Sequence, residues 1–126
     1  MGYRSDVSIV FYSHDTEKLP LASLKLWFDE NYPHKDALED WEAKIETGDD
    51  WIMVTYQYVK WYPDSAHVVA VDTAYARFIE TFDANGSDGL ASSEMVEVGE
   101  QVDDIQEARS DYCRYRLGVR REITFD

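Results

Sequence analysis

The chain has few of the residues that small proteins use for covalent or metal-based stabilisation. Its 126 residues include one cysteine, Cys113, which excludes an internal disulfide framework and a multi-cysteine zinc site. The three histidines, His14, His34 and His67, lack the i, i+4 spacing that places two metal ligands on one helical face. We therefore expect lone surface histidines and a fold held by an ordinary apolar core.

Long apolar runs and glycine-rich loops are also missing. The opening run MGYRSDVSIVFY has a short apolar stretch that continues into a strand pattern, so we expect neither a signal peptide nor a membrane partner. Gly86 and Gly89 precede an expected strand, whereas a phosphate-binding loop precedes a helix. These absences leave no sign of a bound cofactor.

Basic residues are scarce: 12 lysines and arginines stand against 26 acids, which gives a net charge of −14. Such an excess repels nucleic acids and anionic membranes, so we expect no direct nucleic-acid binding and a preference for basic partners. The distribution is uneven, because residues 113–126 hold four arginines and two acids. The preceding 112 residues hold 8 basic and 24 acidic side chains.

Apolar periodicity predicts one α+β domain spanning residues 1–126. The expected strands are residues 7–12, 51–62, 93–99 and 113–125, and the expected helices are residues 21–32, 34–46 and 65–82. The order β-α-(α)-β-α-β-β indicates a two-layer sandwich. We predict an approximately four-stranded, mainly antiparallel sheet with two to three helices on one face.

The expected last strand has one apolar and one basic face. Its apolar side holds Cys113, Tyr115, Leu117, Val119, Ile123 and Phe125, and its other side holds Arg114, Arg116, Arg120 and Thr124. In this position Cys113 is expected to be a small core residue, because no base accompanies it as a nucleophile would require.

The run WIMVTYQYVKWY, residues 51–62, places aromatic residues on both faces of its expected strand. Since the predicted helices cover one face, the other is expected to form an exposed surface for protein recognition. We predict that this interface contains Tyr56, Tyr58, Trp61, Tyr62, Arg114, Arg116 and Arg120. The alternative is that the arginines only pair with acids on neighbouring strands.

Residues 83–94 resemble part of an EF-hand calcium loop. The matches to ligand positions 1, 3, 5 and 12 are Asp83, Asn85, Ser87 and Glu94. The glycine required at position 6 comes one residue late, as Gly89, and a strand pattern follows where an exiting helix is needed. We predict a helix-ending turn that holds no metal, with calcium binding as the alternative.

Two acidic tracts suggest a different class of function. Residues 29–50 carry nine acids against two lysines, and residues 94–111 carry seven acids against one arginine. Carboxylates held at phosphate-like spacing can imitate DNA and occupy the basic groove of a nucleic-acid-binding protein. The alternative is that the charge only keeps the domain soluble.

Three stretches, MGYRSDV, VKWYPD and LGVRREITFD, together resemble a group of small tailed-bacteriophage proteins, mostly without an assigned function. The resemblance covers both ends and the middle of the chain. It implies an accessory protein made in the cytoplasm of the infected bacterial host, and it brings no catalytic residues. The resemblance implies that such a protein binds host factors, blocks defence systems or is itself sensed by defence toxins, for example toxin–antitoxin components. We therefore predict a non-enzymatic protein that binds a bacterial host or defence protein, with DNA mimicry as the alternative.

Overall fold

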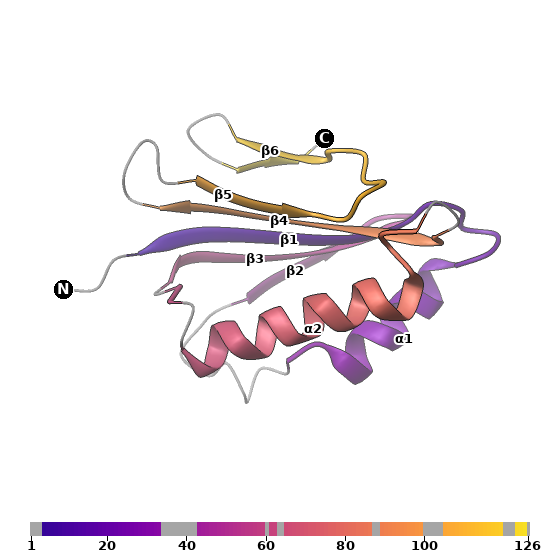
Figure 1. The fold of residues 1–126 in the computed structure, drawn as a ribbon, viewed down its shortest axis with the longest axis horizontal. Coiled ribbons are helices and arrows are strands. Elements are labelled where there is room, and N and C mark those ends of the chain that lie inside the picture. The colour runs from indigo at the N-terminus through magenta and orange to yellow at the C-terminus, as the bar shows by residue number, and fades with distance from the viewer. Residues whose placement is uncertain are drawn as a thin grey trace.

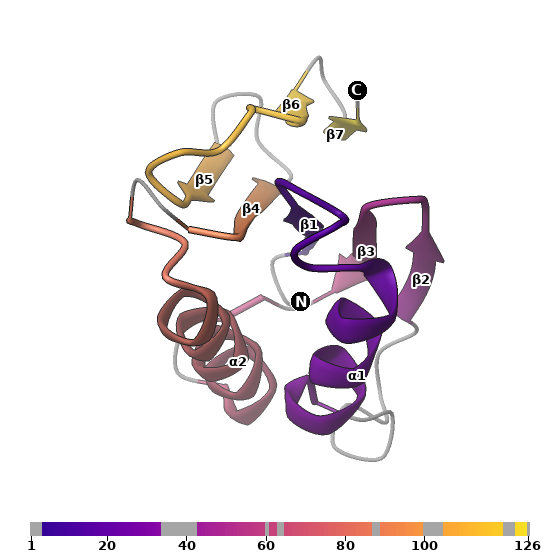
Figure 2. The same cartoon turned by 90° about the vertical axis from the view of Figure 1, so that its right-hand side faces the viewer.

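A computed structural model describes residues 4–33, 43–59, 61–62, 65–86, 89–99, 105–119 and 123–125. In chain order the elements are β1 (Ser5–Ser13), α1 (Leu21–Asn31), β2 (Ala43–Thr47), β3 (Trp51–Val59), α2 (Ala66–Phe82), β4 (Ala91–Gly99), β5 (Ile105–Arg109), β6 (Leu117–Val119) and β7 (Ile123–Phe125). The predicted α+β class is confirmed (Figure 1). Two helices lie on one side of an antiparallel sheet, and the short strands β6 and β7 lie on the other (Figure 2).

The main sheet has five strands in the order β2-β3-β1-β4-β5. Its central strand, β1, pairs with both β3 and β4 in antiparallel register. The sequence explains this position, because β1 is apolar on both faces. Val7, Ile9 and Phe11 point toward the helices, whereas Val10 and Tyr12 point to the opposite side.

The helices cover one face of the sheet through aromatic contacts around Phe11. The ring of Phe11 lies 4.6 Å from that of Phe78 on α2 and 5.8 Å from that of Trp27 on α1, between centroids. α2 begins where Ser65 accepts a hydrogen bond from the Val68 backbone N–H at 3.2 Å, as an N-cap should. The helix predicted at residues 65–82 is therefore confirmed.

The helix predicted at residues 34–46 is wrong at its C-terminal end, because Ala43–Thr47 form strand β2. β2 pairs with the edge of β3 in antiparallel register. A tight turn joins the two strands, and in it Gly48 N–H donates to the Trp51 carbonyl at 3.0 Å. Ile45, placed on a helical stripe by its spacing, instead lies opposite Val54. The edge of β3 and the short turn at Gly48 favour a strand at residues 43–47, and this outweighs the apolar spacing that predicted a helix there. Leu38 and Trp41 of that expected helix lie outside the described residues.

The single strand predicted at residues 113–125 is also wrong. Residues 113–116 are not in a strand, and β6 and β7 form an antiparallel hairpin with Leu117 opposite Phe125. A strand that the sequence patterns did not predict, β5, completes the main sheet. Its sequence, IQEAR, has little apolar alternation because a largely exposed edge strand does not need it.

The hairpin covers part of the sheet face opposite the helices (Figure 2). A second, smaller core forms there around Val10, Tyr12, Val96 and Leu117. Trp51 adds an edge-to-face contact with Phe125, with 4.7 Å between ring centroids. The expectation of one uncovered sheet face is therefore wrong where the hairpin lies.

The helical layer can be tested with the same substitution at two positions of α1. Leu24 is 1% exposed and Leu26 is 60% exposed. We expect Leu24→Ala to lower the free energy of unfolding by about 2–5 kcal/mol, since it leaves a cavity in the core. Leu26→Ala should change it by no more than about 0.5 kcal/mol. Urea denaturation measures both, and equal effects would contradict this placement of α1.

Candidate functional site

The aromatic residues predicted to form an exposed surface divide between the core and the surface. Tyr56 is fully buried and Trp61 nearly so, and their rings lie 6.0 Å apart on the helix side. The Tyr56 hydroxyl shares a 2.8 Å hydrogen bond with that of Tyr32, and burial raises the pKa of Tyr56 to about 12. Tyr62 is exposed, whereas the side chain of Tyr58 lies outside the described part.

The surface prediction is therefore wrong for Tyr56 and Trp61. Ile52, Val54 and Tyr56 all pack into the helix-side core, so the regular alternation of β3 already directs Tyr56 inward. The pairing with β1 becomes irregular only beyond Tyr56, where Val7 lies opposite Tyr56 but Ser5 lies opposite Val59. Simple alternation along residues 51–62 fails at that step. β3 also ends at Val59, so Trp61 is free to turn back onto the core.

The predicted arginines also differ from one another. Arg114 is exposed, whereas Arg120 lies outside the described residues. Arg116 is largely buried: its Nη1 lies 3.3 Å from an oxygen of Asp50, and its guanidinium lies 4.9 Å from the ring centroid of Phe125. Arg116 therefore joins the hairpin to the sheet, and Arg114 is the one of these two described arginines that faces solvent.

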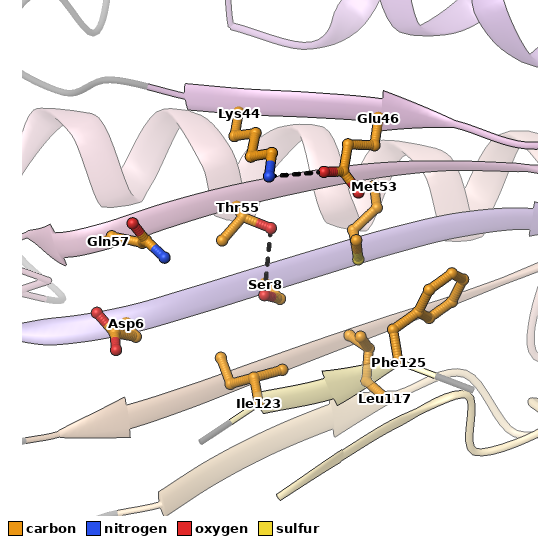
Figure 3. A pocket seen from close by; sticks show the side chains of 10 residues that line it. All are labelled: Asp6, Ser8, Lys44, Glu46, Met53, Thr55, Gln57, Leu117, Ile123 and Phe125. Atoms are coloured by element: carbon orange, nitrogen blue, oxygen red, sulfur yellow. Dashed lines mark hydrogen bonds and ion pairs between the residues drawn. The ribbon is translucent and has the colours of Figure 1, made fainter.

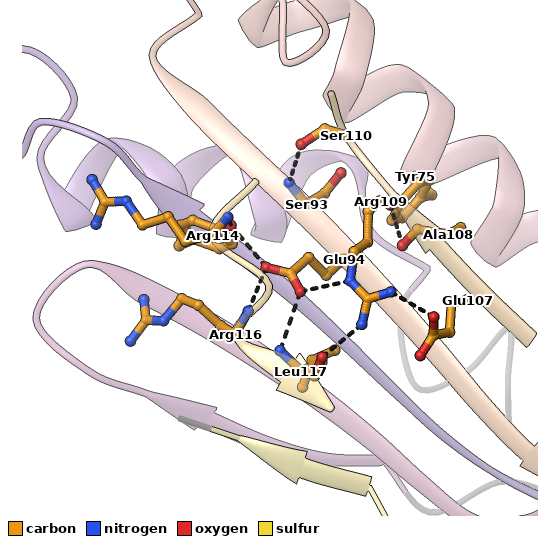
Figure 4. Close-up of polar contacts among 11 residues, drawn as sticks. Tyr75, Ser93, Glu94, Glu107, Ala108, Arg109, Ser110, Arg114, Arg116 and Leu117 are labelled. Carbon is orange, nitrogen blue, oxygen red and sulfur yellow. Dashed lines mark hydrogen bonds and ion pairs between the residues drawn. The ribbon is translucent and has the colours of Figure 1, made fainter. Parts of the chain in front are cut away.

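A buried carboxylate, Glu94 on β4, organises this region (Figure 4). Its Oε2 accepts hydrogen bonds from the Tyr12 hydroxyl at 2.8 Å and the Arg116 backbone N–H at 2.9 Å. Its Oε1 accepts from the Leu117 backbone N–H and from Arg109 Nε, both at 3.1 Å. A buried charge is tolerated only with such partners, and here both oxygens have two.

The partners of Glu94 also bind the segment that precedes β6. Arg109 Nη2 donates to the Leu117 carbonyl at 2.6 Å, and the Tyr12 hydroxyl accepts from the Arg114 backbone N–H at 2.5 Å. Burial raises the pKa of Tyr12 above its ordinary range, so its hydroxyl keeps the proton that it donates to Glu94. The backbone of residues 114–117 is thereby fixed to the sheet at several points.

This anchored backbone holds a loop of residues 112–115, here called the tyrosine loop, that exposes its side chains. Tyr112 is 54% exposed and Tyr115 is 70% exposed, and Arg114 between them also faces solvent. Tyr115 has a φ of 54°, in the left-handed region that a bulky residue rarely adopts. Such strain persists only where the surroundings impose it, and the hydrogen bonds on both sides of Tyr115 do so.

The sequence patterns did not predict this loop, although the run DYCRYR contained a signal for it. Tyr112 received no role, and alternation placed Tyr115 on the apolar side of a strand that does not form there. The density of tyrosine and arginine over residues 111–116 could have identified it.

The EF-hand-like stretch forms the predicted turn. Asp83 ends α2 with a φ of 50°, and its carbonyl accepts a 2.8 Å hydrogen bond from Gly86 N–H. Glu94 is directed into the second core, where its hydrogen-bond donors occupy both oxygens. Asn85 accepts a hydrogen bond from the Asp111 backbone N–H at 2.9 Å, which braces the start of the tyrosine loop. Ser87 lies outside the described residues.

Two groups with nucleophilic potential lie near this site. His14 Nε2 is 2.5 Å from the Ser92 hydroxyl, but Ser92 is fully buried, so a substrate cannot reach it. Burial and the nearby Arg114 lower the pKa of His14. Burial raises the pKa of the Cys113 thiol, which packs against the second core. Cys113 was predicted as a buried residue on the apolar face of a strand; it lies half-buried against the second core, outside any strand.

A cleft of about 290 Å³ lies beside the hairpin on the uncovered part of the sheet (Figure 3). Ser8 and Thr55 form its floor, with their hydroxyls 3.4 Å apart, and Leu117, Ile123 and Phe125 form its apolar wall. Its volume is near the lower limit for small-molecule sites. Within the described ranges, no group of three or more histidine, cysteine or acidic residues could hold a metal ion.

Comparison with known proteins finds no matching family model, no matching curated protein and no matching solved structure. The resemblance to bacteriophage proteins therefore stays a prediction. Among the described residues, neither helix has the length and apolar character needed to cross a membrane.

The two carboxylates that contact Arg109 allow a matched test of the buried network. Glu94 is fully buried, whereas the side chain of Glu107 is 43% exposed. We expect Glu94→Gln to lower the free energy of unfolding by about 3–5 kcal/mol, because it removes the charge and places an amide donor among donors. Glu107→Gln should cost no more than about 1 kcal/mol. Chemical denaturation that ranks Glu107→Gln as the more destabilising change would contradict the described network.

Proposed function

We propose that this chain is a non-enzymatic accessory protein of a tailed bacteriophage that binds a bacterial host or anti-phage defence protein through the tyrosine loop. The observation that carries the proposal is the exposure of Tyr112, Arg114 and Tyr115 on a backbone fixed by Glu94. Tyrosine and arginine are the side chains that most often dominate the energy of protein interfaces.

Preorganisation supports this role. A flexible loop loses conformational entropy when it binds, at about 0.5–1.5 kcal/mol for each immobilised side chain. The backbone of Arg114, Arg116 and Leu117 is already held by hydrogen bonds, so less ordering remains to be done on binding. The guanidinium of Arg109 lies 5.0 Å from the ring centroid of Tyr115, which restricts that ring as well.

DNA mimicry remains the alternative proposal, and the described contacts support it less. Glu94 of the second acidic tract is buried, and Asp50 of the first is paired with Arg116. The strands that belong to these tracts, β2 on one side and β5 on the other, are at opposite edges of the sheet. A mimic needs carboxylates gathered along one surface, as phosphates are along a groove.

The test is a comparison of partner capture from bacterial lysate by the full-length chain and its variants. We expect the wild-type chain to retain a stoichiometric protein, identified by mass spectrometry. A chain with Tyr112→Ala and Tyr115→Asn should bind that protein at least about tenfold more weakly, because losing hot-spot side chains costs about 2 kcal/mol or more each. Asparagine tolerates the left-handed backbone at position 115, so the loop should keep its conformation.

Tyr62→Ala is the control, because it removes an exposed tyrosine from outside the tyrosine loop. Binding should persist in this control and in the presence of competing duplex DNA. A partner lost equally in all variants, or none retained by the wild-type chain, would remove support for the proposal. Binding that disappears between 50 and 200 mM salt and competes with DNA would favour mimicry, since about 6–10 phosphate-like contacts lose 10³–10⁵ in affinity over that range.

A further inference from the structure

The edge strand β2 has features that suit pairing with another strand. It is the first strand in the order of the sheet, and no strand among the described residues pairs with its outer edge. Four of its five residues are exposed, and the side chain of Ile45 at its centre is 53% exposed. An exposed apolar residue on a strand edge is unusual, since such edges are normally blunted against association.

The register of β2 shows which backbone groups point outward. Gly48 N–H donates to the Trp51 carbonyl, so this pair exchanges hydrogen bonds across the turn. Because hydrogen-bonded and non-bonded pairs alternate in an antiparallel ladder, Glu46 and Lys44 also bond toward β3. The amides and carbonyls of Ala43, Ile45 and Thr47 therefore face away from the sheet.

The other edge of β3 gives the same alternation independently. Ser13 N–H on β1 donates to the Asp50 carbonyl at 2.8 Å, which places Asp50 in a bonded pair with β1. Ile52 and Val54 then bond toward β1, which leaves Met53 and Thr55 to bond toward β2.

We propose that β2 pairs in antiparallel fashion with β2 of a second copy of this chain, about a two-fold axis at Ile45. In this register Ile45 lies opposite Ile45 of the copy, and Ala43 lies opposite Thr47, so the outward-facing backbone groups bond to each other. Lys44 lies opposite Glu46 of the copy, and Glu46 opposite Lys44. The result is one continuous sheet across two protomers, with the same patch on each.

Charge complementarity indicates that the strand that pairs with β2 comes from a second copy of this chain. Lys44 and Glu46 lie on the same face of β2, and Lys44 Nζ is 2.9 Å from Glu46 Oε1. In the dimer, Lys44 can form an ion pair with Glu46 of the second copy instead of with Glu46 of its own strand. Glu46 can likewise pair with Lys44 of the second copy. These residue pairs are the non-bonded type, in which side chains approach most closely.

The other edge strand, β5, lacks this self-complementarity. Pairing centred on its middle residue would place Glu107 opposite Glu107 of the copy, and like charges directly opposite each other are destabilising. Self-pairing is therefore specific to β2, and it leaves the tyrosine loop free.

The experiment is sedimentation velocity on the full-length chain over a concentration series. A contact made by one short strand per copy is small, so we expect a reversible dimer with a dissociation constant on the order of 10–100 µM. Lys44→Glu creates two Glu–Glu pairs, and Glu46→Lys creates two Lys–Lys pairs. Each single variant should weaken the dimer roughly tenfold or more.

Mixing the two variants provides the decisive outcome. One copy then presents two glutamates and the other two lysines, so we expect a heterodimer at least as stable as the wild-type dimer. The controls Lys18→Glu and Glu80→Lys make the same charge changes at exposed positions outside β2 and should leave self-association unchanged. A wild-type chain that stays monomeric at about 1 mM, single variants that dimerise normally, or a mixture that does not associate would each overturn the proposal.

Discussion

The carboxylate of Glu94 lies in the interior of an acidic protein, where an ionised group has a high desolvation cost. Hydrogen bonds to both carboxylate oxygens offset that cost. Tyr12 on β1 and Arg109 on β5 donate two of them, and the chain after β5 crosses back over the sheet so that the backbone of Arg116 and Leu117 donates the other two. This arrangement requires residues 114–117 to follow one path across the sheet. The position of the hairpin and of the tyrosine loop both depend on that path.

The fixed path of residues 114–117 also explains why the sheet has a core on each face. The helices bury one face around Phe11, and the hairpin buries part of the other around Val10 and Tyr12. Apolar contact alone does not fix a hairpin as short as β6–β7, whose strands have three residues each. The apolar contacts of Leu117 and Phe125 do not by themselves fix the position of the hairpin along the sheet. The directional hydrogen bonds of Glu94 to the Arg116 and Leu117 backbone fix it. Arg116 adds its ion pair with Asp50 from the turn between β2 and β3.

The elements that the sequence predicted well are those that contribute many buried apolar residues to the two cores. β1, α1, α2 and β4 all have apolar residues at the spacing of their own element, and α2 has a serine cap as well. β2 and β5 were not predicted because edge strands are exposed, and the ladder that holds them is made by the backbone. Tyr56 was placed on the wrong side although it alternates regularly with Ile52 and Val54 into the helix-side core. Trp61, in contrast, lies beyond the irregular pairing at Ser5–Val7 and beyond the end of β3.

The candidate site depended on contacts between distant parts of the chain. Glu94 looked like the last ligand of a calcium loop in the sequence, and its partners Tyr12 and Arg116 are far from it along the chain. Local spacing carries no information on such pairs, so the exposure of Tyr112 and Tyr115 could not be derived from it. Arg114 was placed correctly on the exposed side, although the strand used to place it does not form.

Amide hydrogen exchange in the native chain, followed by nuclear magnetic resonance, measures whether Glu94 fixes the tyrosine loop. We expect the Arg116 and Leu117 amides to exchange as slowly as amides within β4, because their hydrogen bonds to a buried carboxylate open only when the sheet does. The Tyr112 amide, in the exposed part of the loop, provides the fast reference. Arg116 and Leu117 amides that exchange as fast as the Tyr112 amide would contradict this expectation.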